Sequence, residues 1–193
     1  MAHLLVTNDF PPKVGGIQSY LWELWRRLDP ATFTVLTTPY EEAEEWDAAQ
    51  PFRVVRTREP VLLPTPGLAR RIDALADETG ASLVLLDPAL PLGLLGPRLS
   101  RPYGVVLHGA EVTVPGRLPV TRALLGRVLR GAVEVVAAGG YPAAEARRAA
   151  GRDAAVEGLP DHIQAVDVLH DVDLAHARPV PPVAPVRFAQ GPE

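Results

Sequence analysis

Two adjacent glycines, Gly15 and Gly16, occupy a position where a phosphate could bind. They follow an apolar strand candidate, His3 to Val6, and precede a helix candidate, Ile17 to Leu28. The first N–H groups of a helix have no backbone acceptor and lie at the positive end of its dipole, so this position favours phosphate or carboxylate. Glycine also lets a ligand approach the backbone closely. The pair predicts an anion site, although two glycines could equally serve only to relieve strain between strand and helix.

The same loop holds the only lysine of the chain, Lys13, beside eighteen arginines elsewhere, and the only asparagine, Asn8. This placement indicates that the residue types of the loop do not simply follow the composition of the whole chain. Its glycines do not form G-x-G-x-x-G, no acidic residue follows a second strand in the expected place, and the G-K-[ST] ending of a P-loop is missing. NAD and Walker-type sites are therefore disfavoured, and anion binding of another kind remains.

His108 directly follows another strand candidate, Gly104 to Leu107, and precedes Gly109-Ala110-Glu111. A histidine at a strand's carboxyl end, on the same sheet edge as the paired glycines, could donate a hydrogen bond to a sugar hydroxyl or a phosphate. The alternative is a structural histidine. Glu111 could orient His108 or cap the segment that follows it.

Several arginines could contact an anionic acceptor or a membrane surface, namely Arg56, Arg58, Arg70, Arg71 and Arg117. Acidic residues share the helix candidate of Arg70 and Arg71, so a polybasic membrane face is not predicted there. The apolar segment Val61-Leu62-Leu63, between two prolines, is a better candidate for contact with acyl chains, or it belongs to the core. Three histidines near the C-terminus are irregularly spaced, and no metal site is predicted from them.

The elements that must position these residues alternate between strand and helix. Strand candidates are His3 to Val6, Phe33 to Thr37, Arg53 to Arg56, Leu83 to Leu86, Gly104 to Leu107 and Val133 to Ala137; helix candidates are Ile17 to Leu28, Leu68 to Asp77 and Leu118 to Arg130. Short apolar strands between amphipathic helices predict a parallel sheet covered on both faces, a doubly wound α/β fold. Ligands of such sheets bind beyond the carboxyl ends of the strands.

Composition limits the classes of function. The chain of 193 residues has no cysteine, which fits a reducing cytoplasm, and neither a signal peptide nor a spanning apolar stretch is evident. A net charge of −4 gives no support for nucleic-acid binding. Residues 1 to 150 carry 16 basic and 16 acidic side chains, whereas residues 151 to 193 carry 3 and 7. We therefore expect a Rossmann-like domain over 1–150 and an acidic, proline-rich tail over 151–193.

Four segments in chain order resemble the N-terminal half of actinobacterial family-four glycosyltransferases, and the phosphatidylinositol mannoside mannosyltransferases within that family above all. They are Asn8-Asp9-Phe10-Pro11-Pro12 with Gly15-Gly16-Ile17-Gln18-Ser19-Tyr20, Leu62-Leu63-Pro64-Thr65-Pro66, Pro91-Leu92-Gly93-Leu94-Leu95, and His108-Gly109 with Glu111-Val112. The resemblance covers residues 1 to 150. It implies the GT-B fold, in which two Rossmann-like domains face each other across a cleft and this chain supplies the N-terminal, acceptor-side domain.

The resemblance also implies site roles. Gly15 and Gly16 would approach the diphosphate of a sugar nucleotide such as GDP-mannose. Gln18 would contact the polar head of the acceptor, and His108 the transferred sugar or the acceptor. The other substrate-binding residues expected are Asp9, Lys13, Glu111 and Arg117. Transfer of the mannosyl group would retain anomeric configuration without a metal or cofactor, by front-face attack. The acceptor would be of phosphoinositide type or another kind, which would place the protein in the cytoplasm with peripheral contact at the inner membrane face.

The chain departs from the family in two places. Gly139-Gly140-Tyr141 stands where members carry a serine closely followed by an aromatic residue. The family's interdomain linker is matched only in part, by His170 to Leu174 and Pro181 to Phe188. The basic pair and the paired glutamates of the donor domain are absent from this sequence. We therefore expect the tail to be a linker remnant and the chain to be inactive without a separate donor domain. A non-catalytic binding or scaffold module and a degenerate remnant are the alternatives.

Overall fold

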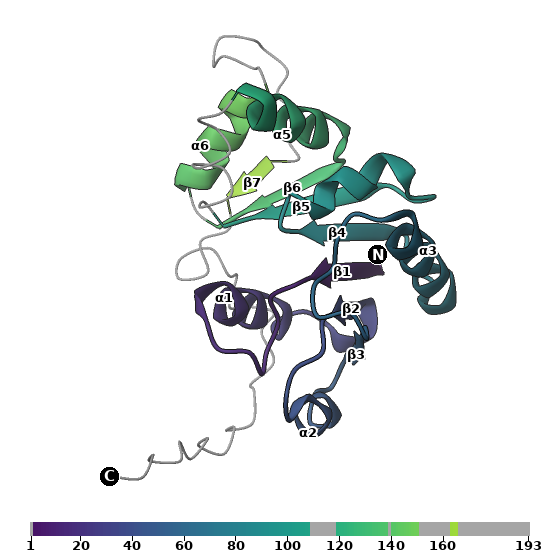
Figure 1. Ribbon diagram of the computed structural model, residues 1–193. Coiled ribbons are helices and arrows are strands. Elements are labelled where there is room, and N and C mark those ends of the chain that lie inside the picture. Colours follow the sequence, from purple (N-terminus) through teal and green to yellow (C-terminus); the bar gives the residue numbers. More distant parts are fainter. Residues whose placement is uncertain (1, 109–118, 139, 151–162, 166–193) are drawn as a thin grey trace.

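The computed structural model describes residues 2–108, 119–138, 140–150 and 163–165. They contain a parallel sheet of seven strands in the order β3-β2-β1-β4-β5-β6-β7 (Figure 1). The strands are β1 (His3–Thr7), β2 (Phe33–Thr37), β3 (Arg53–Arg56), β4 (Leu83–Asp87), β5 (Tyr103–Leu107), β6 (Glu134–Ala137) and β7 (Ile163–Ala165). The helices are α1 (Gly16–Trp25), α2 (Ala43–Ala48), α3 (Pro66–Thr79), α5 (Pro119–Gly131) and α6 (Gly140–Ala149), with 3-10 turns η1 (Pro30–Thr32) and η2 (Leu92–Arg98).

The predicted doubly wound α/β fold is confirmed. Leu4 and Val6 of β1 pack into one hydrophobic cluster with α3, η2, α5 and α6. Leu5, between them, packs on the opposite face against Leu21 and Trp25 of α1. Successive strand residues point to opposite faces, so a sheet covered on both faces needs the uninterrupted apolar runs that the sequence shows. Figure 1 shows α1 and α3 on opposite sides of the sheet.

Helix α1 is shorter than predicted at its C-terminal end. It ends at Trp25, and the buried residues are Gln18, Leu21 and Trp25, whereas Leu28 is exposed. Asp29 precedes Pro30 and is extended, because a residue before proline avoids helical backbone angles, and the chain leaves the helix before this point. The indole of Trp25 donates a hydrogen bond from Nε1 to His3 Nε2 over 2.9 Å. Trp25 is therefore buried with a polar partner for its N–H group, and Ile17 and Leu24 pack against the same cluster as partly buried residues.

Three elements extend the sequence prediction. The acidic segment after β2 forms α2, whose Glu44 and Glu45 are exposed. The proline-interrupted apolar run after β4 forms η2, with Leu92 and Leu95 fully buried. Strand β7 pairs in parallel with β6 and lies beyond residue 150. The division of the chain at residue 150 stays a prediction.

The strand order reverses between β1 and β4. From β1 the chain proceeds through β2 to β3 on one side, and β4 to β7 follow on the other side of β1. In open parallel sheets, the carboxyl ends of the two strands at such a reversal border the ligand crevice. Thr7 ends β1 and pairs in register with Asp87, the last residue of β4. This edge also carries the loop before α1 and His108 after β5, so the sheet brings the predicted site residues to one rim.

Candidate functional site

The loop between β1 and α1 leaves the first turn of α1 open. Gly15 precedes the helix with an extended backbone, and no side chain caps the helix there. A Cβ on Gly15 would lie 2.2 Å from Gln18 Oε1, so Gln18 occupies the space of a side chain at that position. A Cβ on Gly16 would meet no atom of residues 2–108, 119–138, 140–150 or 163–165 within 4 Å. Glycine at position 16 is thus not required by contacts within the described part of the chain, and the helix start remains accessible to a ligand.

Asp9 holds the loop together by accepting two hydrogen bonds at the same oxygen. Lys13 Nζ donates to Asp9 Oδ1 over 2.8 Å, and Gln18 Nε2 donates to it over 2.7 Å. Gln18 is buried, whereas the Lys13 side chain is 44% exposed. The carboxylate neutralises the lysine in this structure. An arriving anion would therefore meet the backbone N–H groups of α1 directly and Lys13 only in competition with Asp9.

His108 is held by Asp87, a residue that the sequence reasoning missed. His108 Nε2 lies 2.8 Å from Asp87 Oδ1, and the two side chains are 7% and 1% exposed. The other carboxylate oxygen accepts a hydrogen bond from Thr7 Oγ1 over 2.6 Å. Thr7 Oγ1 in turn accepts from the backbone N–H of Asp9 over 2.9 Å. The available signal was an aspartate that closes an apolar strand, where a charge is costly unless it is hydrogen-bonded.

A chain of hydrogen bonds and one ring contact therefore join the two predicted motifs. The bonds run from Gln18 through Asp9, Thr7 and Asp87 to His108. The ring of Tyr20, one turn into α1, meets the imidazole of His108 edge-on with 5.4 Å between centroids. The first turn of α1 and His108 thus belong to one connected site. Glu111 and Arg117, the remaining predicted site residues, lie outside the described residues.

Asn8 has a structural role that its rarity in the sequence did not reveal. Its side chain clamps the loop after β3: Asn8 Oδ1 accepts from the Leu62 N–H over 2.7 Å, and Asn8 Nδ2 donates to the Leu62 carbonyl over 3.2 Å. Arg56 is also structural, because its guanidinium binds both oxygens of Asp47 and the Pro11 carbonyl. These contacts fix the two loops that flank the end of β1.

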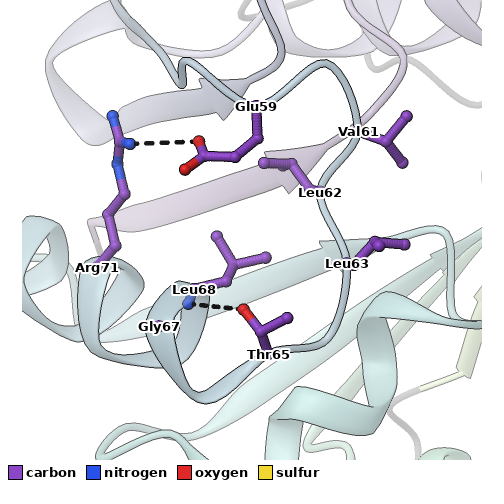
Figure 2. A pocket seen from close by; sticks show the side chains of 8 residues that line it. All are labelled: Glu59, Val61, Leu62, Leu63, Thr65, Gly67, Leu68 and Arg71. Atoms are coloured by element: carbon purple, nitrogen blue, oxygen red, sulfur yellow. Dashed lines mark hydrogen bonds and ion pairs between the residues drawn. The ribbon is translucent and has the colours of Figure 1, made fainter.

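A pocket of about 230 Å³ lies beside this clamp, between the loop after β3 and the start of α3 (Figure 2). Leu62 and Leu68 point into it, and Arg71 borders it with one nitrogen 3.7 Å from Glu59 Oε2. Val61 and Leu63 are 54% and 56% exposed, whereas Leu62 between them is buried. The segment Val61-Leu62-Leu63 is therefore core at its middle residue and open surface on either side. Arg58 is exposed and has no hydrogen bond or ion pair to the described residues.

The described residues contain neither a membrane-crossing helix nor a metal cluster. No helix in the described ranges combines the length and apolar character that crossing a bilayer needs. The same ranges contain no group of three or more histidine and acidic side chains that could hold a metal ion. The histidines near the C-terminus, His162, His170 and His176, lie outside the described residues.

Comparison with solved structures identifies the fold to which this sheet belongs. The chain matches HepE of Anabaena, a GT-B glycosyltransferase solved in complex with UDP, with a TM-score of 0.57, 16% identity, and coverage of 79% of this chain and 42% of that one. A second structure of HepE, with UDP and glucose, matches with a TM-score of 0.55. The described fold is similar to that of a GT-B glycosyltransferase domain.

Sequence comparison identifies relatives of this chain. The chain is 39% identical over 187 residues to the GDP-mannose-dependent alpha-(1-6)-phosphatidylinositol monomannoside mannosyltransferase of Mycolicibacterium smegmatis, and 38% identical over 167 residues to that of Mycobacterium tuberculosis. A related mannosyltransferase of Corynebacterium glutamicum is 39% identical over 94 residues. The predicted resemblance to the N-terminal half of actinobacterial phosphatidylinositol mannoside mannosyltransferases is confirmed. No protein-family model matches the chain.

The match covers only part of each relative. It extends over 91% of this chain but 47% of the M. smegmatis enzyme, and over 81% of this chain but 43% of the M. tuberculosis enzyme. The chain thus spans about half the length of the curated relatives it matches.

Proposed function

We propose that this chain forms the acceptor-binding wall of a retaining mannosyltransferase that uses GDP-mannose as its donor. The observation that carries the proposal is the open first turn of α1 on the same rim as His108, at the point where the strand order reverses. The similarity to GDP-mannose-dependent enzymes supports the choice of donor.

The donor diphosphate would bind at the start of α1. The first N–H groups of the helix and its dipole favour an anion there, and the space beyond Gly16 admits one. Lys13 would exchange Asp9 for a phosphate oxygen, which costs an ion pair that is partly exposed and therefore weak. His108, held by Asp87, would contact the transferred sugar.

The acceptor would bind on the side of the loop after β3. The pocket there combines apolar walls with the guanidinium of Arg71, and the exposed Val61 and Leu63 lie beside it (Figure 2). This combination suits a molecule with an anionic head and apolar chains, such as a phosphoinositide. Contact of Val61 and Leu63 with acyl chains would bring the protein to the inner face of the membrane as a peripheral protein.

Transfer itself would need a second wall. The main contribution of the protein would be electrostatic stabilisation of the departing diphosphate. Positioning of donor and acceptor between the two domains would lower the activation barrier further, by several kcal/mol, on the order of the effect known for well-oriented reactants. A donor-binding domain facing this rim would complete the cleft. We expect the 193-residue polypeptide by itself to bind GDP-mannose weakly and to transfer no sugar.

Calorimetric titration of the chain with GDP-mannose and with inositol phosphate tests the proposal. Gly16→Val is expected to abolish GDP-mannose binding without loss of stability, because no atom of the described residues lies within 4 Å of the Cβ position. Gly67→Val is the matched control at the start of α3, where the nearest atom to a Cβ is Thr65 Oγ1 at 3.8 Å. It should leave GDP-mannose binding intact and weaken binding of the acceptor head group.

His108→Ala should weaken GDP-mannose binding and leave the fold intact. A folded wild-type chain that binds neither ligand would contradict the proposal and favour a scaffold module or a remnant. Equal loss of GDP-mannose binding in Gly16→Val and Gly67→Val would show that the donor does not bind at α1.

A further inference from the structure

Asp87 meets His108 in a geometry that restricts the imidazole. The Asp87 carboxylate is almost fully buried, and its two oxygens are used differently: Oδ2 accepts from Thr7 Oγ1 over 2.6 Å, and Oδ1 lies 2.8 Å from His108 Nε2. Thr7 pairs in register with Asp87 and belongs to the neighbouring strand β1. The carboxylate therefore cannot rotate away from His108 without breaking a buried hydrogen bond.

This geometry determines where the imidazole carries its proton. An ionised carboxylate only accepts hydrogen bonds, so the ring nitrogen that faces it must donate. A neutral His108 then bears its proton on Nε2, and its Nδ1 is an acceptor. A hydroxyl group that meets Nδ1 must donate to it. The carboxylate thus determines both the orientation of the ring and the direction of any hydrogen bond that the ring makes on its other side.

We propose that Asp87 is a positioning residue that holds His108 in the Nε2–H tautomer. Its role in sugar binding rests on the function proposed above, whereas the tautomer itself does not. Asp87 acts through His108 and through its own contact with Thr7. The hydrogen-bond chain that continues from Thr7 to the Asp9 backbone couples this orientation to the loop before α1.

Nitrogen-15 NMR of the full chain, labelled at its five histidines, reads the tautomer directly. The signals of His108 are assigned by their loss in His108→Gln. In the ligand-free wild type, His108 is expected as the Nε2–H tautomer. In Asp87→Asn, Thr7 still donates to the side-chain oxygen, so the amide NH₂ faces the ring and the proton moves to Nδ1. Nearly complete reversal of the tautomer is expected, by the logic known for an Asp-to-Asn change beside a catalytic histidine.

Thr7→Val is the matched control. It removes the hydroxyl beside Asp87 with little change of shape and leaves the carboxylate facing His108. We expect Thr7→Val to lower stability at least as much as Asp87→Asn but to keep the Nε2–H tautomer. GDP-mannose binding should weaken by about tenfold in Asp87→Asn, the value of one hydrogen bond.

The outcomes separate this inference from the proposed function. An Nδ1–H tautomer in the wild type overturns it, even if Asp87→Asn does not fold. A folded Asp87→Asn that keeps the Nε2–H tautomer, or a Thr7→Val that loses it, also overturns it. If the tautomer reverses as expected but the wild type does not bind GDP-mannose, Asp87 positions His108 and the proposed donor is wrong.

Discussion

Thr7 and Asp87, eighty residues apart in the sequence, close the carboxyl ends of two adjacent strands with a buried hydrogen bond of 2.6 Å. Their strands are the two between which the order of the sheet reverses. Thr7 leads on to the loop before α1, and Asp87 leads across to His108. A single pair thus connects the glycine loop with the histidine that the sequence had placed at the same edge.

Removal of the Asp9 carboxylate should loosen the glycine loop. Asp9→Ala deprives Lys13 and the buried Gln18 of their shared acceptor. A buried amide without a partner costs about 1–3 kcal/mol, and we expect a loss of this size in urea unfolding. Lys13→Ala is the control: its side chain is half exposed, so the change should stay below about 1 kcal/mol. Equal losses in the two variants would mean that Asp9 does not act through Gln18.

The Asn8 clamp should govern the order of the loop after β3. Asn8→Ala removes two hydrogen bonds to Leu62 and leaves its N–H without that acceptor. We expect about 1–3 kcal/mol of lost stability and faster amide exchange over residues 57–65 by mass spectrometry. Val61→Ala, at an exposed position in the same loop, should change stability by less than about 0.5 kcal/mol. Unchanged exchange in Asn8→Ala would contradict the clamp.

His3 should make stability depend on pH in the acid range. Burial, and secondly repulsion by the N-terminal amine, lower the pKa of His3 from 6.5 to about 4. Between these values the unfolded chain binds a proton that the folded chain does not, so stability is full above pH 6.5 and falls as pH decreases towards 4.

The loss from His3 should be about 1–2 kcal/mol, reduced by its partial exposure to solvent. Denaturant unfolding at a series of pH values, followed by tryptophan fluorescence, measures it. The difference between the wild type and His3→Gln isolates this contribution from the other histidines. A constant difference across the range would show that His3 titrates alike in both states.

A side chain at Gly104 of β5 would meet both neighbouring strands, β4 and β6. A Cβ there would lie 2.6 Å from Leu85 Cδ2 and 2.8 Å from the Glu134 carbonyl oxygen. The Glu134 oxygen is a backbone atom, so it can move away only if strand β6 shifts. Gly104→Ala should destabilise the fold by about 1–3 kcal/mol in thermal or urea unfolding. Gly67→Ala, with its nearest contact at 3.8 Å, should be neutral or slightly stabilising. A neutral Gly104→Ala would mean that β5 can shift relative to β4 and β6.

Local patterns predicted most of the secondary structure, because each strand is a short apolar run and each long helix repeats leucine or isoleucine. Strands β2 and β3 have the predicted bounds, and β1, β4, β5 and β6 differ by one residue at one end. Helix α1 was less predictable. Its predicted range reached Leu28, but the helix ends at Trp25, whose buried indole donates a hydrogen bond to His3. Such a contact depends on a residue of another element, which no local pattern contains.

The sequence by itself determined that Gly15, Gly16 and His108 lie on one rim, because parallel strands that alternate with helices end at the same edge. It could not determine which side chains meet there. Asp87 reaches His108, and Thr7 reaches Asp87, only because the register between β1 and β4 and between β4 and β5 aligns residues that are far apart in the chain. The tertiary structure likewise decided that Asn8 binds Leu62, which lies 54 residues away in the chain. Contacts between distant elements depend on packing of the whole sheet, and this packing assembled separate motifs into one hydrogen-bonded site.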